Sequence, residues 1–150
     1  MVQKLAQENL PRRTKNWLIG HYKGVARALA WIGIFAIIVL SVVPAVDRPV
    51  TGLGQWFEHF TAFALVGGAF AIGYCLSLSR LLLLAFFFCG GMELLQVPLP
   101  TRHARISDFV IDFCGSCFAI GCVVVGYEFI GTNRRRSTNL MPPGQMSRLS

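Results

Sequence analysis

Four of the seven carboxylates in this 150-residue sequence lie in or at the edge of apolar segments on the predicted outer side: Glu58, Glu93, Asp108 and Asp112. An ionisable side chain at the centre of a bilayer costs about 2.5–3.5 kcal/mol on insertion scales, so such residues usually line a cavity. Five other polar residues fall at the same level: His59, Gln96, Arg102, His103 and Arg105. An acid, a base and a cation in one place are the groups that acid–base catalysis and phosphate binding require.

Four long apolar segments must position these residues. They cover about 28–46, 57–78, 81–99 and 106–130, with short polar connections between them. A helix that crosses a bilayer takes roughly 20 residues. Only 14% of the residues are charged, against about 25% in soluble domains. The sequence therefore predicts an all-α fold, an integral membrane bundle of about four transmembrane helices.

The chain divides into three parts in this prediction. Residues 1–27 form a basic segment at the cytoplasmic surface, residues 28–131 form the membrane domain, and residues 132–150 form a polar tail that we expect to be disordered. Lys and Arg favour the cytoplasmic side of a membrane. With both termini inside, the outer side holds only Arg48, Arg102 and Arg105 of the 14 basic residues. The net charge of +7 is thus explained by topology rather than by nucleic-acid binding.

The depth of each polar residue follows from the helix rise. Counted from Leu81, Glu93 lies roughly 18 Å into a hydrocarbon core of about 30 Å, and Gln96 lies one turn further out on the same face. We expect an outward-opening pocket with Glu93 at its floor. Four further side chains should surround its mouth: His59, Asp108, Arg102 and Arg105.

The last apolar segment carries a polar and small-residue face. Its members recur at three- and four-residue spacing: Asp108, Asp112, Gly115, Ser116 and Ala119. Such a face is typical of a helix that packs closely against its neighbours. Glu58 and His59, by contrast, point about 100° apart on a helix. We therefore expect at least one of these two side chains to lie outside the pocket.

The order of the polar residues is distinctive. A histidine opens one apolar segment, and Glu93-Leu94-Leu95-Gln96 closes the next. Pro100-Thr101-Arg102, Ser107-Asp108, Asp112 and Gly115 then follow. This combination resembles the VanZ-like family, which is named for a protein associated with teicoplanin resistance. The resemblance covers about 55–121, with a weaker match at 41–44.

Several positions depart from the family pattern. Gln55 and Trp56 stand where the family often has Asp-Lys, which removes an ion pair at the rim of the pocket. Phe63 stands in place of a tyrosine, and Asp112 in place of the usual asparagine. The resemblance implies a bacterial cytoplasmic membrane protein of a broader group proposed to act on lipid head groups.

One hypothesis is an enzyme that acts on a phosphate-bearing lipid or polyprenyl carrier at the outer membrane surface. His59 would be the general base or nucleophile, and Asp108 the residue that orients Arg or His. Glu93 would be the general acid or would orient His59. Substrate would be bound by Gln96, Arg102, Arg105 and, through a paired arginine, Asp112. Arginine suits this task because it pairs bidentately with phosphate. The partner is then a membrane lipid or lipid-linked substrate, and no cofactor is implied.

Three alternatives remain open. The same cluster would serve a non-catalytic protein that binds lipid, glycopeptide or cell-envelope partners. A metal site is disfavoured because Arg102 is close and no HExxH-type spacing is present. The five cysteines do not imply a redox site, because their positions inside apolar segments are explained by packing as small apolar residues. Ion transport is disfavoured because polar residues do not continue into the inner half of the helices.

Overall fold

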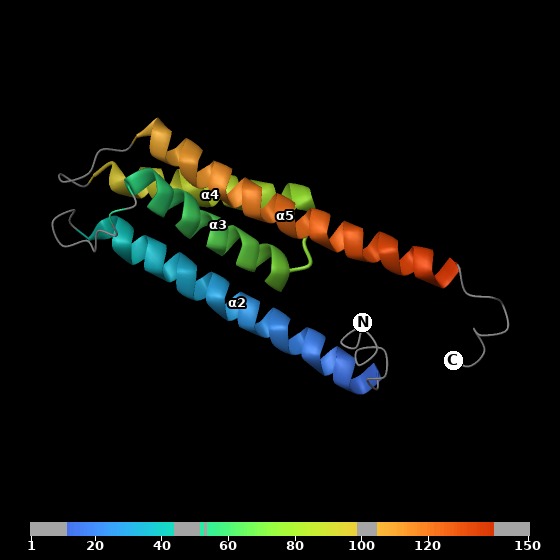
Figure 1. Ribbon diagram of the computed structural model, residues 1–150. Coiled ribbons are helices and arrows are strands. Elements are labelled where there is room, and N and C mark those ends of the chain that lie inside the picture. The colour runs from blue at the N-terminus through green and yellow to red at the C-terminus, as the bar shows by residue number, and fades with distance from the viewer. Residues whose placement is uncertain (1–11, 44–51, 53, 99–104, 140–150) are drawn as a thin grey trace.

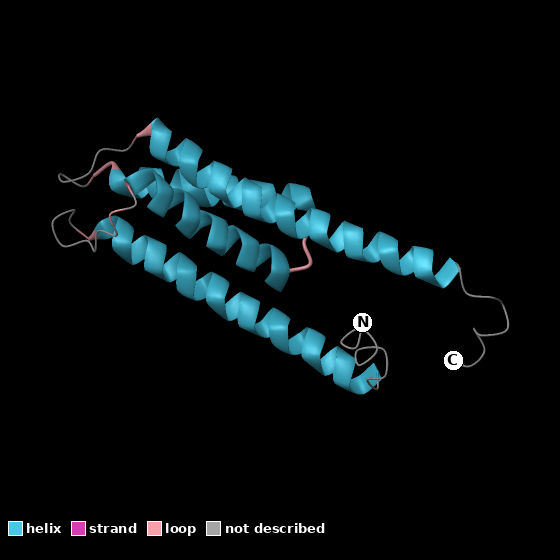
Figure 2. Cartoon of the chain, viewed as in Figure 1, coloured by secondary structure: helices cyan, strands magenta, loops and turns pink. Residues whose placement is uncertain are grey.

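The computed structural model describes residues 12–43, 52, 54–98 and 105–139, and its described part is entirely helical (Figures 1 and 2). Four helices follow one another: α2 (Arg12–Val42), α3 (Gln55–Gly73), α4 (Leu78–Gln96) and α5 (Ile106–Asn139). No strand occurs within these ranges. The prediction of an all-α fold with four helices is confirmed.

The helices differ in extent from the predicted segments. Helix α2 already begins at Arg12, so the described part of the basic segment continues without interruption into the first apolar segment. No proline lies within residues 12–43, and proline is the residue that most strongly breaks a helix. Helix α5 likewise runs on to Asn139. Both long helices project beyond the short helices α3 and α4 at the same end of the bundle (Figure 1).

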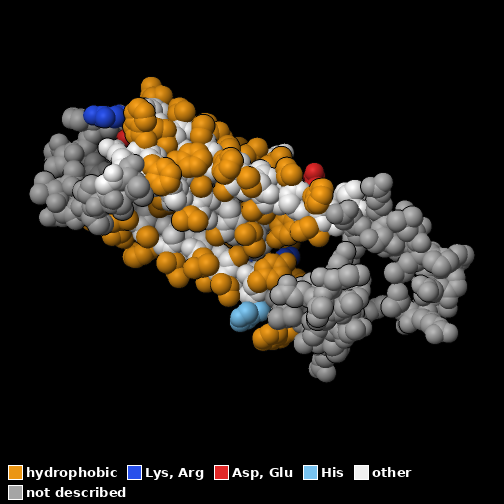
Figure 3. Space-filling model, viewed as in Figure 1, with side chains coloured by type: hydrophobic (Ala, Val, Ile, Leu, Met, Phe, Trp, Pro, Cys, Tyr) orange, Lys and Arg blue, Asp and Glu red, His pale blue; other side chains and the backbone are white. Residues whose placement is uncertain are grey.

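Three helices are long and apolar enough to cross a membrane. These stretches are Ile19–Val42, Leu78–Gln96 and Ile106–Thr132. Large hydrophobic side chains cover the outside of the bundle (Figure 3), as Phe35 at 69% exposed and Leu65 at 70% exposed illustrate. Such a surface is suited to lipid and is unusual in contact with water. These features fit a membrane protein.

Helix α3 occupies the centre of the bundle. It packs most extensively against α5 and next against α2, whereas α4 packs mainly against α5 and has little contact with α2. The contact between α3 and α5 is very close, because a Cβ on Gly67 would lie 3.1 Å from the Cα of Ser116. The predicted small-residue face is confirmed, since Asp112, Gly115 and Ser116 are all buried.

The α3–α4 connection is short and reverses the chain direction. Tyr74 has an extended backbone that ends α3 at Gly73, five residues before the predicted end, and α4 begins at Leu78. A Cβ on Gly73 would lie 2.9 Å from Cγ of Arg27 and 3.1 Å from its backbone nitrogen. Glycine at this position therefore allows α2 to approach the end of α3.

Candidate functional site

The polar residues singled out by the sequence gather at one end of the bundle. We call this the polar end: here α2 ends at Val42, α3 begins at Gln55, α4 ends at Gln96 and α5 begins at Ile106 (Figure 1). We call the opposite end, with the Tyr74–Ser77 connection, the basic end. Helices of alternating direction bring these four termini together, so residues far apart in the sequence become neighbours.

A histidine–aspartate pair joins α3 to α5 at the polar end. His59 Nδ1 lies 3.0 Å from Asp112 Oδ1, and the two side chains are 15% and 3% exposed. The close approach of α3 and α5 at Gly115 brings the two backbones near enough for this contact. With the proton on Nδ1, the ring donates to the carboxylate, and Nε2 carries the lone pair that a general base needs.

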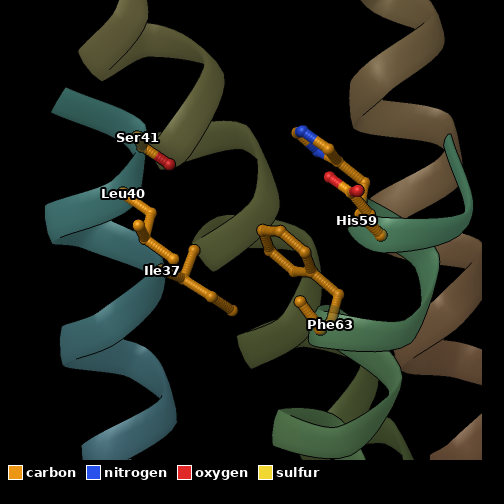
Figure 4. Close-up of a pocket in the computed structure, with 7 residues that line it drawn as sticks. Ile37, Leu40, Ser41, His59 and Phe63 are labelled. Carbon is orange, nitrogen blue, oxygen red and sulfur yellow. The ribbon is translucent and has the colours of Figure 1, made fainter. Parts of the chain in front are cut away.

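A pocket of about 110 Å³ lies beside this pair, between α2 and α3 (Figure 4). Helix α2 contributes Ile37, Leu40 and Ser41, and Phe63 points toward Ile37 from α3. Glu58 and His59 both line the pocket, together with Ala62. The expectation that one of this adjacent pair lies outside was wrong. A pocket that spans the groove between two helices admits side chains from two directions on the same helix.

Asp108 has a different neighbour from the one expected. It is buried, and its two oxygens accept hydrogen bonds from Gln55 Nε2 at 3.4 Å and from Ser107 Oγ at 3.1 Å. The carboxylate that contacts His59 is therefore Asp112, not Asp108. In the sequence, Gln55 stands out only as a departure from the family pattern. Its position one helical turn before His59 is the signal that places both on one face of α3.

Glu93 does not form the floor of the His59 pocket. It lines a separate pocket of about 210 Å³ with Arg105, Ile106 and Phe109, where α4 meets the start of α5. Its Oε2 accepts a hydrogen bond of 3.0 Å from the backbone N–H of Arg105. A carboxylate at the N-terminus of a helix also interacts favourably with the helix dipole. The packing of α4 mainly against α5 explains why Glu93 faces this direction.

The remaining predicted residues are placed as follows. Gln96 is buried at 6% exposure and lines neither of these two pockets. The side chain of Arg105 is exposed. Arg102 and His103 lie outside the described residues. Ser41, which the prediction did not include in the site, is buried and lines the His59 pocket.

Within the described ranges, no three His, Cys, Asp or Glu side chains come together as metal ligands. All five cysteines are free thiols, and Cys89 is the buried one. The chemistry that the polar end offers is therefore that of an oriented imidazole, nearby carboxylates and the Ser41 hydroxyl.

A third, apolar cavity lies toward the middle of the bundle. Its volume is about 320 Å³, roughly twice that of an engineered apolar cavity that binds benzene. All four helices contribute to its lining, for example Ile38, Val66, Leu84 and Ile120. Leu84 is 49% exposed, so the cavity reaches the outer surface of the bundle between α2 and α4.

Comparisons with protein-family models, with curated proteins and with solved structures found no match to the chain. The chemistry and placement of its own residues are therefore the basis for a functional assignment.

Proposed function

We propose that the chain is a VanZ-like integral membrane protein that acts on a phosphate-bearing lipid or polyprenyl-linked head group. The site is the polar end, which we place at the outer face of the bacterial cytoplasmic membrane. The His59–Asp112 pair beside a pocket is the observation that carries the proposal. A buried carboxylate that orients an imidazole is an arrangement used in general-base catalysis.

Four membrane-spanning helices are part of this proposal. Helix α3 has 19 residues, which corresponds to about 28 Å of rise and matches a hydrocarbon core of about 30 Å. Its polar residues Gln55, Glu58 and His59 lie in the first turns, at the membrane surface. Lys23, Arg27 and Arg80 lie toward the basic end, which by the positive-inside rule is cytoplasmic. Both termini are then cytoplasmic.

This topology predicts the accessibility of two serines at opposite ends. In a cysteine-free background, Ser107→Cys at the polar end should react with a membrane-impermeant maleimide in intact cells. Ser77→Cys at the basic end should react only after the membrane is opened; both serines are exposed, which makes them a matched pair. Labelling of Ser77→Cys in intact cells would show that the basic end is outside and would contradict the proposed orientation.

The pair supports a simple reaction at phosphorus. His59 takes the proton from a water or alcohol as its oxygen forms a bond to phosphorus, and Asp112 stabilises the resulting imidazolium. The bond between phosphorus and the leaving oxygen breaks, and His59 returns the proton to that oxygen. Arg105, which lines the Glu93 pocket at the same end of the bundle, would bind the non-bridging oxygens of a phosphate that extends from His59 toward it. Atoms and charge balance without a cofactor.

The apolar cavity supports a lipid as the substrate. Two consecutive residues of α2 line the His59 pocket and the apolar cavity: Ile37 lines the pocket and Ile38 lines the cavity. A head group beside His59 would thus have an apolar space within reach for part of its chain.

A comparison of lipid extracts tests the proposal. Membranes of cells with and without the protein should differ in at least one phosphate-bearing lipid by mass spectrometry. The Glu93→Gln variant should retain part of the conversion, because Glu93 lies in a separate pocket from His59. Identical extracts in the presence of well-folded protein would contradict catalysis.

One observation favours the second candidate function, a non-catalytic protein that binds lipid, glycopeptide or cell-envelope partners. The carboxylate expected as general acid, Glu93, lines a different pocket from the expected base. Co-purification of a lipid with the protein, with no altered lipid in the extract, would support this candidate over the enzyme.

A further inference from the structure

The basic end contains a pocket that the proposed function does not use. Its volume is about 360 Å³, and it lies between the start of α2, the α3–α4 connection and α5. Its polar lining consists of Tyr22, Lys23, Tyr74, Cys75 and Tyr127. Apolar side chains, among them Leu81 and Val124, form its other side. We refer to it as the basic-end pocket.

No carboxylate is among the residues that line this pocket. Lys23 Nζ donates a hydrogen bond of 2.9 Å to the thiol sulfur of Cys75, a weak acceptor. One turn further along α2, Arg27 Nε donates to the carbonyl oxygen of Gly73 at 2.8 Å, and its guanidinium lies 5.1 Å from the centre of the Tyr74 ring. Arg27 thus holds the end of α3, and Lys23 is the cation that faces the pocket.

The depth of Lys23 matches that of a lipid head group. Lys23 lies 19 residues before Val42, the last residue of α2. At 1.5 Å per residue this is about 29 Å, nearly the full thickness of the hydrocarbon core. The pocket therefore opens at the membrane boundary opposite to the His59 site.

We infer that the basic-end pocket binds the phosphate of an anionic phospholipid. Lys23 supplies a point charge for the phosphate. The hydroxyls of Tyr22 and Tyr127 are hydrogen-bonded to each other, which leaves one O–H of this pair as a donor beside it. Basic pockets between transmembrane helices on the cytoplasmic side are known to take such head groups. The apolar side, at Leu81 and Val124, suits the first carbons of the acyl chains. This site is independent of any chemistry at His59.

Quenching of tryptophan fluorescence by brominated lipids tests the inference. Trp31 Nε1 donates a hydrogen bond of 2.9 Å to the hydroxyl of Tyr74, so Trp31 reports on the neighbourhood of the pocket. The exposed Trp17 and Trp56 are first replaced by phenylalanine in the full-length protein. In vesicles, each brominated lipid competes with unlabelled lipid for the site and quenches Trp31 when it is bound. The relative binding constant of brominated phosphatidylglycerol should be at least about five times that of brominated phosphatidylcholine, because of one lysine–lipid contact.

Substitution of the lysine assigns the preference to the pocket. Lys23→Ala and Lys23→Gln should both reduce the ratio of the binding constants, phosphatidylglycerol over phosphatidylcholine, to near one. Lys23→Arg should keep this ratio. Arg80→Ala is the matched control, because Arg80 is an exposed cation on α4 near the basic end that does not line the pocket. An unchanged ratio in the two neutral Lys23 variants, or an equal loss in Arg80→Ala, would overturn the inference.

Inorganic phosphate distinguishes a lipid from a soluble anion. At constant ionic strength, an excess of phosphate over chloride should leave the lipid preference unchanged, because phosphate lacks the acyl chains that the apolar side holds. Displacement of the brominated lipid by phosphate would identify a soluble-anion site and overturn the assignment to lipid.

Discussion

Gly115→Ala should force α3 away from α5 and disrupt the His59–Asp112 pair. A Cβ at this position would clash with the carbonyl oxygen of Phe60, and it would lie 3.1 Å from the carbonyl carbon and 3.2 Å from Cα. These are backbone atoms, which cannot rotate away as a side chain can. Phe60 directly follows His59, so the displacement falls on the His59–Asp112 pair. The free energy of unfolding should decrease by about 1–3 kcal/mol, the usual cost of overpacking.

Gly121→Ala is the matched control on the same helix. No atom lies within 4 Å of a Cβ at Gly121. Alanine there should leave stability unchanged or raise it by up to about 1 kcal/mol through helix propensity. Unfolding in mixed micelles with increasing fractions of SDS gives both values. Equal stability of the two variants would contradict the close contact between α3 and α5.

Asp112→Ala should lower turnover of the lipid substrate about 10²- to 10⁴-fold, the range that general acid–base catalysis contributes. The imidazole would lose the carboxylate that lies 3.0 Å from Nδ1, and with it the orientation of the ring and the stabilisation of its protonated form. His59→Ala should cause a loss of the same order. The double variant should be no worse than either single variant, because residues that act as a unit are non-additive.

His21→Ala controls for the loss of a histidine elsewhere. His21 stacks on Trp17 near the start of α2, with ring centres 5.2 Å apart, and lies toward the other end of the helix from the site. Turnover should be unaffected by this change, as measured by mass spectrometry of the converted lipid. Losses in Asp112→Ala and His59→Ala that multiply in the double variant would show that the two side chains act separately.

The helices were predictable because their signal is strong. Apolar runs of about 20 residues with few charges leave few alternatives to a helix in a membrane. The packing face of α5 was predictable too, since the spacing of Asp112, Gly115 and Ser116 fixes their common side. The start of α2 was not predictable from the sequence. The polar residues after Arg12 are compatible with either a surface segment or the first turns of a longer helix.

The composition of the site was predictable only in part. Counting residues along a helix gives height in the membrane but not the neighbour that a side chain faces. Glu93 was therefore predicted to form the floor of the pocket, yet it accepts a hydrogen bond from Arg105 and lines a separate pocket from His59. Gln55 was overlooked because its contact with Asp108 joins residues 53 positions apart on two helices. Such pairings depend on how α3 and α5 are rotated against each other.

The apolar cavity between α2 and α4 has a consequence for how a ligand arrives. Trp31 and Leu84 contribute to its lining and are themselves 57% and 49% exposed, so the cavity faces the surrounding lipid. A ligand that enters here diffuses within the plane of the membrane and never crosses water. Its occupancy then depends on its mole fraction in the bilayer, not on a bulk concentration. Alkyl detergents used to extract the protein would compete for the same space.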